Sequence, residues 1–216
     1  MGKEPIRAVI FDSDGTLVET ERVSYGVLAT ELDRHGIPMT LEEALEDWSG
    51  ADMNEMLRVL QARASVKLPD DFMDTFRAAQ RVRLETETEP IDGAMELLSE
   101  LALPRGVASN APVYKVELCL RTAGLIDYFD TSHIYSAYEV DAWKPEPDVF
   151  LHAASSMGFP ASQCAVVEDS APGVEAARAA GMHVFALDPR GRMDLPSDVE
   201  RLERLEHLLR FLPGHR

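Results

Sequence analysis

The chain has 216 residues, of which 45% are apolar, and its formal net charge is -17. This length suits one large domain or a core with a small inserted domain, and the apolar content argues against wholesale disorder. The negative charge disfavours nucleic acid and anionic membranes as partners, because both carry negative phosphate groups.

The first residues and the cysteines indicate a cytoplasmic protein. The N-terminal segment lacks the apolar region of a signal peptide, and no run approaches the roughly 18 apolar residues of a membrane span. Cys119 and Cys164 lie in apolar stretches, so we expect buried free thiols, with a disulfide or a reactive thiol as the alternative. We expect a monomer, with a weak dimer as the alternative.

Short apolar runs alternate with helical patterns over much of the chain. The predicted strands are Ile6–Phe11, Gly106–Ala108, Cys164–Val167, His183–Leu187 and, more weakly, His133–Ser136. The predicted helices are Gly93–Leu103, Pro112–Ala123, Pro147–Met157 and Pro172–Ala180. This alternation predicts an α/β fold, a Rossmann-like doubly wound parallel sheet.

Residues 19–89 interrupt that alternation with consecutive helical segments. The predicted helices are Glu21–His35, Leu41–Trp48, Met53–Ala64 and Asp70–Glu87. A crossover between parallel strands needs only about a dozen residues. We therefore predict an inserted all-helical cap domain at 19–89, and a core domain formed by 1–18 and 90–216. At the C-terminus, the leucine spacing of Val199–Leu212 predicts an amphipathic helix packed on the core, with a partner-binding coil as the alternative.

The sequence directly after the first predicted strand combines two carboxylates, a glycine and a hydroxyl. Asp12 and Asp14 are two positions apart, so their side chains point the same way in extended backbone. A divalent cation would relieve their repulsion. Gly15 permits a sharp turn, and Thr16 offers a hydroxyl donor. The ordinary alternative is an acidic turn that caps the next helix.

Three further polar groups follow later strands. They are Ser109 with Asn110, Lys144, and Glu168 with Asp169. Each has a structural alternative: a helix cap for Ser109 and Asp169, and a surface lysine for Lys144. Together with Asp12 and Asp14 they supply a nucleophile, a proton donor, metal ligands, a hydroxyl donor and a cation, which are the groups that phosphoryl transfer requires.

In this order and context, the motifs resemble those of the haloacid dehalogenase-like superfamily of phosphatases, over about residues 5–190. The resemblance implies that Asp12 is the nucleophile and that Asp14 is the general acid and base. It implies that Ser109 and Lys144 bind the transferring phosphoryl group, with Gly15, Thr16 and Asn110 beside it. It also implies a Mg²⁺ ion held by the Asp12 carboxylate, the Asp14 backbone carbonyl and the Asp169 carboxylate, with Glu168 acting directly or through water.

Within this superfamily, Asp14 favours phosphate esters over carbon–halogen bonds, because dehalogenases lack an acid at that position. The only cap lysine, Lys67, has an undistinguished context, which disfavours carbon–phosphorus cleavage. The loop Trp48–Met53 resembles the specificity loop of such caps. We take Trp48, Asn54, Arg77 and Arg81 as candidate cap specificity residues, although for the two arginines a solvated helix face paired with nearby glutamates is the preferred interpretation.

The second half resembles bacterial 6-phosphogluconate phosphatases in the segments Ser136–Pro147 and Cys164–Ser170. A small sugar phosphate or sugar-acid phosphate is therefore the expected substrate. Phosphoglycolate hydrolysis and β-phosphoglucomutase-like phosphotransfer are the alternatives. Those mutases carry an arginine shortly after the glycine that corresponds to Gly50, where this chain has Asp52, Met53 and Asn54. A receiver-like phospho-aspartate signalling module is the non-enzymatic alternative, and it lacks both the long insertion and the Asp-x-Asp-Gly-Thr motif.

Overall fold

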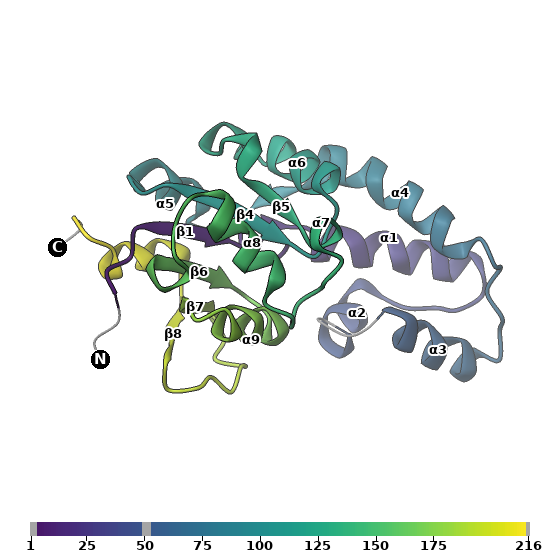
Figure 1. Cartoon of the computed structure of the whole chain (residues 1–216). Helices are drawn as coiled ribbons and strands as arrows, with labels where there is room; N and C mark the ends of the chain where they lie inside the picture. The colour runs from purple at the N-terminus through teal and green to yellow at the C-terminus, as the bar shows by residue number, and fades with distance from the viewer. Residues whose placement is uncertain (1–3, 49–52, 215–216) are drawn as a thin grey trace. The chain divides into compact units, whose positions relative to one another are not determined.

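The computed structural model describes residues 4–48 and 53–214, and the chain divides into two compact units (Figure 1). The core unit comprises Met1–Val18 and Pro90–Arg216, and the helical unit comprises Glu19–Glu89. Two short strands, β2 (Val18–Glu19) and β3 (Glu89–Pro90), pair where the chain passes from one unit to the other. Each unit has an apolar cluster of its own.

In the described part of the core unit, a six-stranded sheet has the order β5-β4-β1-β6-β7-β8. Its strands are β1 (Ala8–Phe11), β4 (Arg105–Ser109), β5 (Ile134–Ser136), β6 (Cys164–Glu168), β7 (His183–Leu187) and β8 (Val199–Leu202). Every neighbouring pair is parallel. All residues of β1 and β6 are buried, as expected for strands covered on both faces. The predicted α/β class and parallel sheet are confirmed.

The strand order reverses at β1. From β1 the sheet extends through β4 to β5 on one side, and through β6, β7 and β8 on the other. Phe11, the last residue of β1, is in register with Val107 of β4 and Val167 of β6. The residues just beyond these positions therefore lie level with one another. Ligands of open α/β sheets bind at such a reversal, outside the carboxyl ends of the strands.

Helices lie on both faces of the sheet (Figure 1). They are α5 (Ala94–Glu100), α6 (Val113–Thr122), α7 (Ala137–Val140), α8 (Asp148–Ser156) and α9 (Ala171–Ala179). On one face, α8 and α9 pack over alternate strand residues such as Ala8, Ile10 and Val166. Of the helices in the described residues, none combines the length and apolarity needed to cross a membrane.

The described helical unit contains α1 (Glu21–Arg34), α2 (Leu41–Asp47), α3 (Met53–Ala64) and α4 (Phe72–Glu87). Buried side chains from these helices, including Leu28, Met56 and Phe76, form its apolar cluster. Helix α2 begins with a capping box. The Thr40 hydroxyl accepts a hydrogen bond from the Glu43 N–H at 3.1 Å, and the Glu43 carboxylate accepts one from the Thr40 N–H at 2.8 Å.

The predicted C-terminal helix at Val199–Leu212 is wrong. Its first residues form β8, whose backbone pairs with the edge of β7, and Leu205–Phe211 form a 3₁₀-helix. Leu205 and Leu208 are both buried, and a spacing of three suits the three residues per turn of a 3₁₀-helix. The same leucine spacing is also compatible with an α-helix. Residues 199–202 form a strand instead because β7 offers an edge with which their backbone can pair.

The capping box of α2 can be tested by substitution. We expect Thr40→Ala to lower the free energy of unfolding by about 1 kcal/mol, because the N–H groups of the first turn lose their side-chain acceptor. Thr30→Ala is the matched control, since Thr30 lies inside α1 and alanine is the better helix former. Urea unfolding measures both variants, and equal losses would contradict the role of the cap.

Candidate active site

Lys144 connects three strands at the carboxyl edge of the sheet. Its side chain is buried, and its ammonium group donates to a carboxylate oxygen of Asp12, to the Ala108 carbonyl at 3.0 Å and to Glu168 Oε1 at 2.7 Å. It also lies 4.7 Å from the ring centroid of Phe150. An ammonium group has three donors, so these three acceptors satisfy it. The structure therefore brings together Asp12, Lys144 and Glu168, which lie far apart in the sequence.

The turn after β1 brings Asp169 to the same edge. The buried Thr16 hydroxyl donates to Asp169 Oδ1 at 2.9 Å. Gly15 has φ +86°, and a Cβ atom there would lie 2.1 Å from Asp169 Oδ2. Both the left-handed backbone and this close approach require glycine. Gly15 and Thr16, which we predicted to lie beside the phosphoryl group, thus position the Asp169 carboxylate.

Asp14 forms an ion pair with Lys115 that its sequence motif does not predict. Lys115 Nζ donates to Asp14 Oδ2 at 2.9 Å, and the two side chains are 24% and 33% exposed respectively. Lys115 lies in the first turn of α6, the helix that follows β4. A lysine near the N-terminus of a helix interacts unfavourably with the helix dipole. An unexplained lysine in the first turn of a predicted helix could therefore have indicated a carboxylate partner.

Ser109 and Asn110 follow the end of β4. The buried Ser109 hydroxyl accepts from the Ala111 N–H at 3.0 Å, a bond that does not use its own proton. The Asn110 side-chain oxygen accepts from the Lys144 N–H at 3.0 Å. Asn110 therefore fixes the loop that carries Lys144, whereas Ser109 keeps a hydroxyl proton that can be donated.

Glu168 is fully engaged with neighbouring groups. Its Oε1 accepts from Lys144, and its Oε2 accepts from the Ser170 N–H and hydroxyl at 3.0 and 2.8 Å. At Gly173, a Cβ atom would lie 1.9 Å from the Glu168 carboxylate carbon, so only glycine leaves room for this side chain. These contacts indicate that Glu168 orients Lys144 and the start of α9.

The electrostatics of this edge are dominated by buried carboxylates. Burial raises the pKa of Asp12 well above its usual value, Lys144 opposes that rise, and Glu168 and Asp169 add to it. Burial and then the charge of Glu168 raise the pKa of Asp169 to about 7. Burial opposes the charged form of Lys144, but Asp12 and Glu168 raise its pKa above the usual value overall. Three carboxyl groups thus share one ammonium group, and the raised pKa values of Asp12 and Asp169 mean that both hold their protons to a higher pH than usual.

The donor atoms fit a hard cation such as Mg²⁺. Asp12 and Asp169 offer carboxylate oxygens, and Asp14 offers a backbone carbonyl. Within residues 4–48 and 53–214, no group of three or more His, Cys, Asp or Glu side chains could hold a metal ion by itself. The predicted Mg²⁺ site does not need three such side chains. Its third protein ligand is a backbone carbonyl, and Mg²⁺ usually keeps water molecules or a substrate oxygen as further ligands.

The four candidate specificity residues belong to the helical unit. Asn54, Arg77 and Arg81 are exposed, and Arg81 pairs with Glu85 at 3.2 Å, as the solvated-face alternative expects. The Trp48 carbonyl accepts from the Tyr25 hydroxyl. The middle of the predicted specificity loop, residues 49–52, lies outside the described residues.

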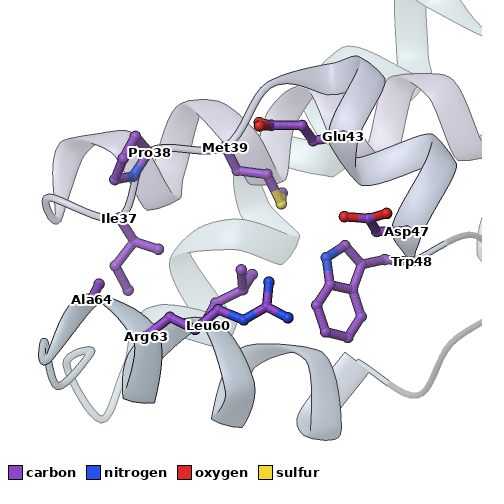
Figure 2. A pocket seen from close by; sticks show the side chains of 9 residues that line it. All are labelled: Ile37, Pro38, Met39, Glu43, Asp47, Trp48, Leu60, Arg63 and Ala64. Atoms are coloured by element: carbon purple, nitrogen blue, oxygen red, sulfur yellow. The ribbon is translucent and has the colours of Figure 1, made fainter.

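A pocket of about 270 Å³ lies within the helical unit, between the segment 37–39, α2 and α3 (Figure 2). Its wall includes Trp48, and the guanidinium carbon of Arg63 lies 5.9 Å from the Trp48 ring centroid. Glu43, another lining residue, is bound in the capping box. The residues gathered around Lys144 do not line this pocket.

Comparison with known proteins identifies the family. The model of the haloacid dehalogenase-like hydrolases matches residues 6–181. The chain belongs to this family. The sequence is 31% identical to 6-phosphogluconate phosphatase of Escherichia coli (strain K12), across 94% of this chain and 93% of that protein. It is also 31% identical to hexitol phosphatase A of the same strain, across 95% of this chain and 91% of that protein.

A solved structure of a haloacid dehalogenase-like protein of unknown function from Agrobacterium tumefaciens supports the same assignment. It superposes with a TM-score of 0.80 at 33% identity, across 94% of this chain and 96% of that one. Family membership together with the phosphatases among the relatives makes this chain a phosphatase.

The raised pKa of Asp169 predicts how stability depends on pH. The folded protein holds the proton of the Asp169 carboxyl group more tightly than the unfolded chain does. The protonated group therefore contributes to the free energy of unfolding below pH 3.8, and this contribution is lost as pH rises through about 7. We expect the unfolding free energy of metal-free protein to decline over this range, and Asp169→Asn to flatten the decline. Mg²⁺ added at high pH should raise the melting temperature of the parent more than that of Asp169→Asn.

Asp127→Asn serves as the control for this experiment, because Asp127 is exposed. It should keep both the pH slope and the response to Mg²⁺. An unchanged slope in Asp169→Asn would contradict the assignment.

Proposed function

We propose that this phosphatase hydrolyses a small sugar phosphate or sugar-acid phosphate, such as 6-phosphogluconate, with Mg²⁺ and through a phosphorylated Asp12. The observation that carries the proposal is the contact of the buried Lys144 ammonium with Asp12 at the reversal of strand order. Asp169 approaches the same turn through Thr16, and Asp14 lies two residues from Asp12. A nucleophile, a cation and a potential proton donor therefore lie at one edge of the sheet.

The first step transfers the phosphoryl group to the protein. A carboxylate oxygen of Asp12 attacks phosphorus, and the bond between phosphorus and the ester oxygen breaks. In its protonated form, Asp14 gives its proton to the leaving alkoxide, which departs as an alcohol. The Ser109 hydroxyl and the Lys144 ammonium stabilise the charge on the phosphoryl oxygens.

The second step releases phosphate. The Asp14 carboxylate takes a proton from a water molecule, whose oxygen attacks phosphorus. The bond between phosphorus and the Asp12 oxygen breaks, which gives inorganic phosphate and restores the Asp12 carboxylate. Asp14 is thereby protonated again for the next substrate, so a single residue serves both steps.

Asp12 and Asp169, with the Asp14 carbonyl, would hold Mg²⁺. When bound, this ion supplies positive charge beside the transferring phosphoryl group. It would also offset the charge of the Asp12, Glu168 and Asp169 carboxylates, which Lys144 alone cannot neutralise. Glu168 contributes by holding Lys144, because both of its oxygens are already engaged.

We assign the helical unit as the cap that excludes water and reads the leaving group. Its separate apolar cluster supports this, since a unit with its own core can move as a body. The substrate class is supported by the relatives named for 6-phosphogluconate and for hexitols. The cap residues that read the sugar are proposed to include Trp48 and Asn54.

A panel of phosphomonoesters tests the activity and substrate class. We expect the highest kcat/KM for 6-phosphogluconate, hexitol phosphates or hexose phosphates, and lower values for phosphoglycolate and nucleotides. Omitting Mg²⁺ should abolish turnover, because the charge on the phosphoryl oxygens is then poorly balanced. Asp12→Asn should be inactive and serves as the control for contaminating phosphatases. A preference for phosphoglycolate or nucleotides would contradict the proposed class.

Asp14→Asn tests the acid–base assignment. We expect kcat on a sugar phosphate to decrease about 10²- to 10⁴-fold, which is the usual contribution of a general acid–base group. The variant should fold, because Asp14 is partly exposed and asparagine has nearly the same shape. Circular dichroism checks the fold and a phosphate-release assay measures the rate. Near-normal turnover would refute the role of Asp14.

A further inference from the structure

The Lys115–Asp14 ion pair connects two parts of the core unit that are distant in sequence. Lys115 comes from the first turn of α6, and Asp14 comes from the turn after β1, 101 positions earlier. Lys115 Nζ and Asp14 Oδ2 are 2.9 Å apart, within the range of a charge-assisted hydrogen bond. The contact therefore directly restrains the side chain that the proposed reaction uses for proton transfer.

The location of Lys115 is unfavourable without such a partner. A cation in the first turn of a helix lies near the positive end of the helix dipole. The Lys115 side chain is also only 24% exposed, so its ammonium group has lost part of its hydration. By contrast, Arg121 pairs with Glu117 on the surface of the same helix and is 58% exposed. Lys115 is thus placed where a nearby carboxylate is needed to offset both costs, and Asp14 makes the largest favourable contribution to its charged form.

We infer that Lys115 is a positioning residue, which holds the Asp14 carboxyl group in the orientation required for proton transfer. This inference rests on the proposed function. The ammonium group restricts rotation of the Asp14 side chain. A displacement of about 1 Å in a reacting group can slow a reaction roughly 10²-fold, so this restraint has a measurable effect on rate.

The two proton transfers respond differently to the leaving group. In the first step, the P–O ester bond breaks as Asp12 binds phosphorus. An alkoxide leaving group needs the proton of Asp14, whereas a stable aryl oxide can leave without it. In the second step, Asp14 takes a proton from water as the bond from Asp12 to phosphorus breaks, and no leaving group can replace that transfer. A misplaced Asp14 therefore slows the second step for every substrate, but spares the first step for aryl esters.

Rapid-mixing kinetics of Lys115→Met with p-nitrophenyl phosphate and Mg²⁺ test the inference. We expect a fast release of one equivalent of p-nitrophenol per enzyme, followed by turnover roughly 10- to 100-fold slower than in the parent. KM should not rise, because Lys115 does not bind substrate in this scheme. Arg121→Met on the same helix is the matched control and should behave as the parent does.

Three results would overturn the inference. Unchanged turnover would show that Asp14 needs no such restraint. A raised KM with unchanged kcat would make Lys115 a substrate-binding residue. A slow first release would place its effect on Asp12 or on the phosphoryl group. Equal melting temperatures of Lys115→Met and the parent exclude loss of folding as the cause.

The double variant Asp14→Asn/Lys115→Met separates this inference from the proposed function. If Lys115 acts through Asp14, its substitution should have little further effect once Asp14 is asparagine. If Lys115→Met lowers kcat by the same factor in Asp14→Asn as in the parent, the inference is overturned and the role of Asp14 remains intact. If Asp14→Asn by itself turns over normally, the acid–base assignment in the proposed function fails.

Discussion

The buried ammonium group of Lys144 is the interaction on which the candidate active site depends. It contacts the Ala108 carbonyl of β4, Glu168 of β6 and Asp12, which directly follows β1, so it joins the ends of three adjacent strands. Without this cation, two buried carboxylates would face each other at the sheet edge, and such an arrangement is costly. The same contacts place the cation beside the proposed nucleophile, so one interaction serves both the stability and the proposed chemistry of this edge.

The sheet makes that interaction possible through its strand order. Because β1 is flanked by β4 and β6, residues from three distant segments are level at its carboxyl end. Glycines then allow close approach: Gly15 admits the Asp169 carboxylate, and Gly173 admits the Glu168 carboxylate. The fold thus gathers three carboxyl groups at one point, where a hard cation would offset their charge and that of a phosphoryl group.

Sequence patterns predicted much of the fold but only part of the geometry. The strand β6 was predictable because strands buried on both faces are almost continuously apolar. The C-terminal segment was not, since the leucine spacing at 199–212 fits more than one structure and β7 offered an edge for pairing. At the site, Asp12 and Lys144 were recognisable from their motifs. Lys115 could not be predicted in the same way, because it contacts Asp14, 101 positions away in the sequence.

The sequence by itself determined the family and the α/β class and predicted which side chains are chemically active, because these depend on local patterns and short motifs. The tertiary structure decided which groups each side chain contacts. It assigned Thr16 to Asp169, Asn110 to the Lys144 loop and Lys115 to Asp14. Such pairings depend on the register of neighbouring strands and on the distance between atoms, and neither is encoded in the spacing of residues along the chain.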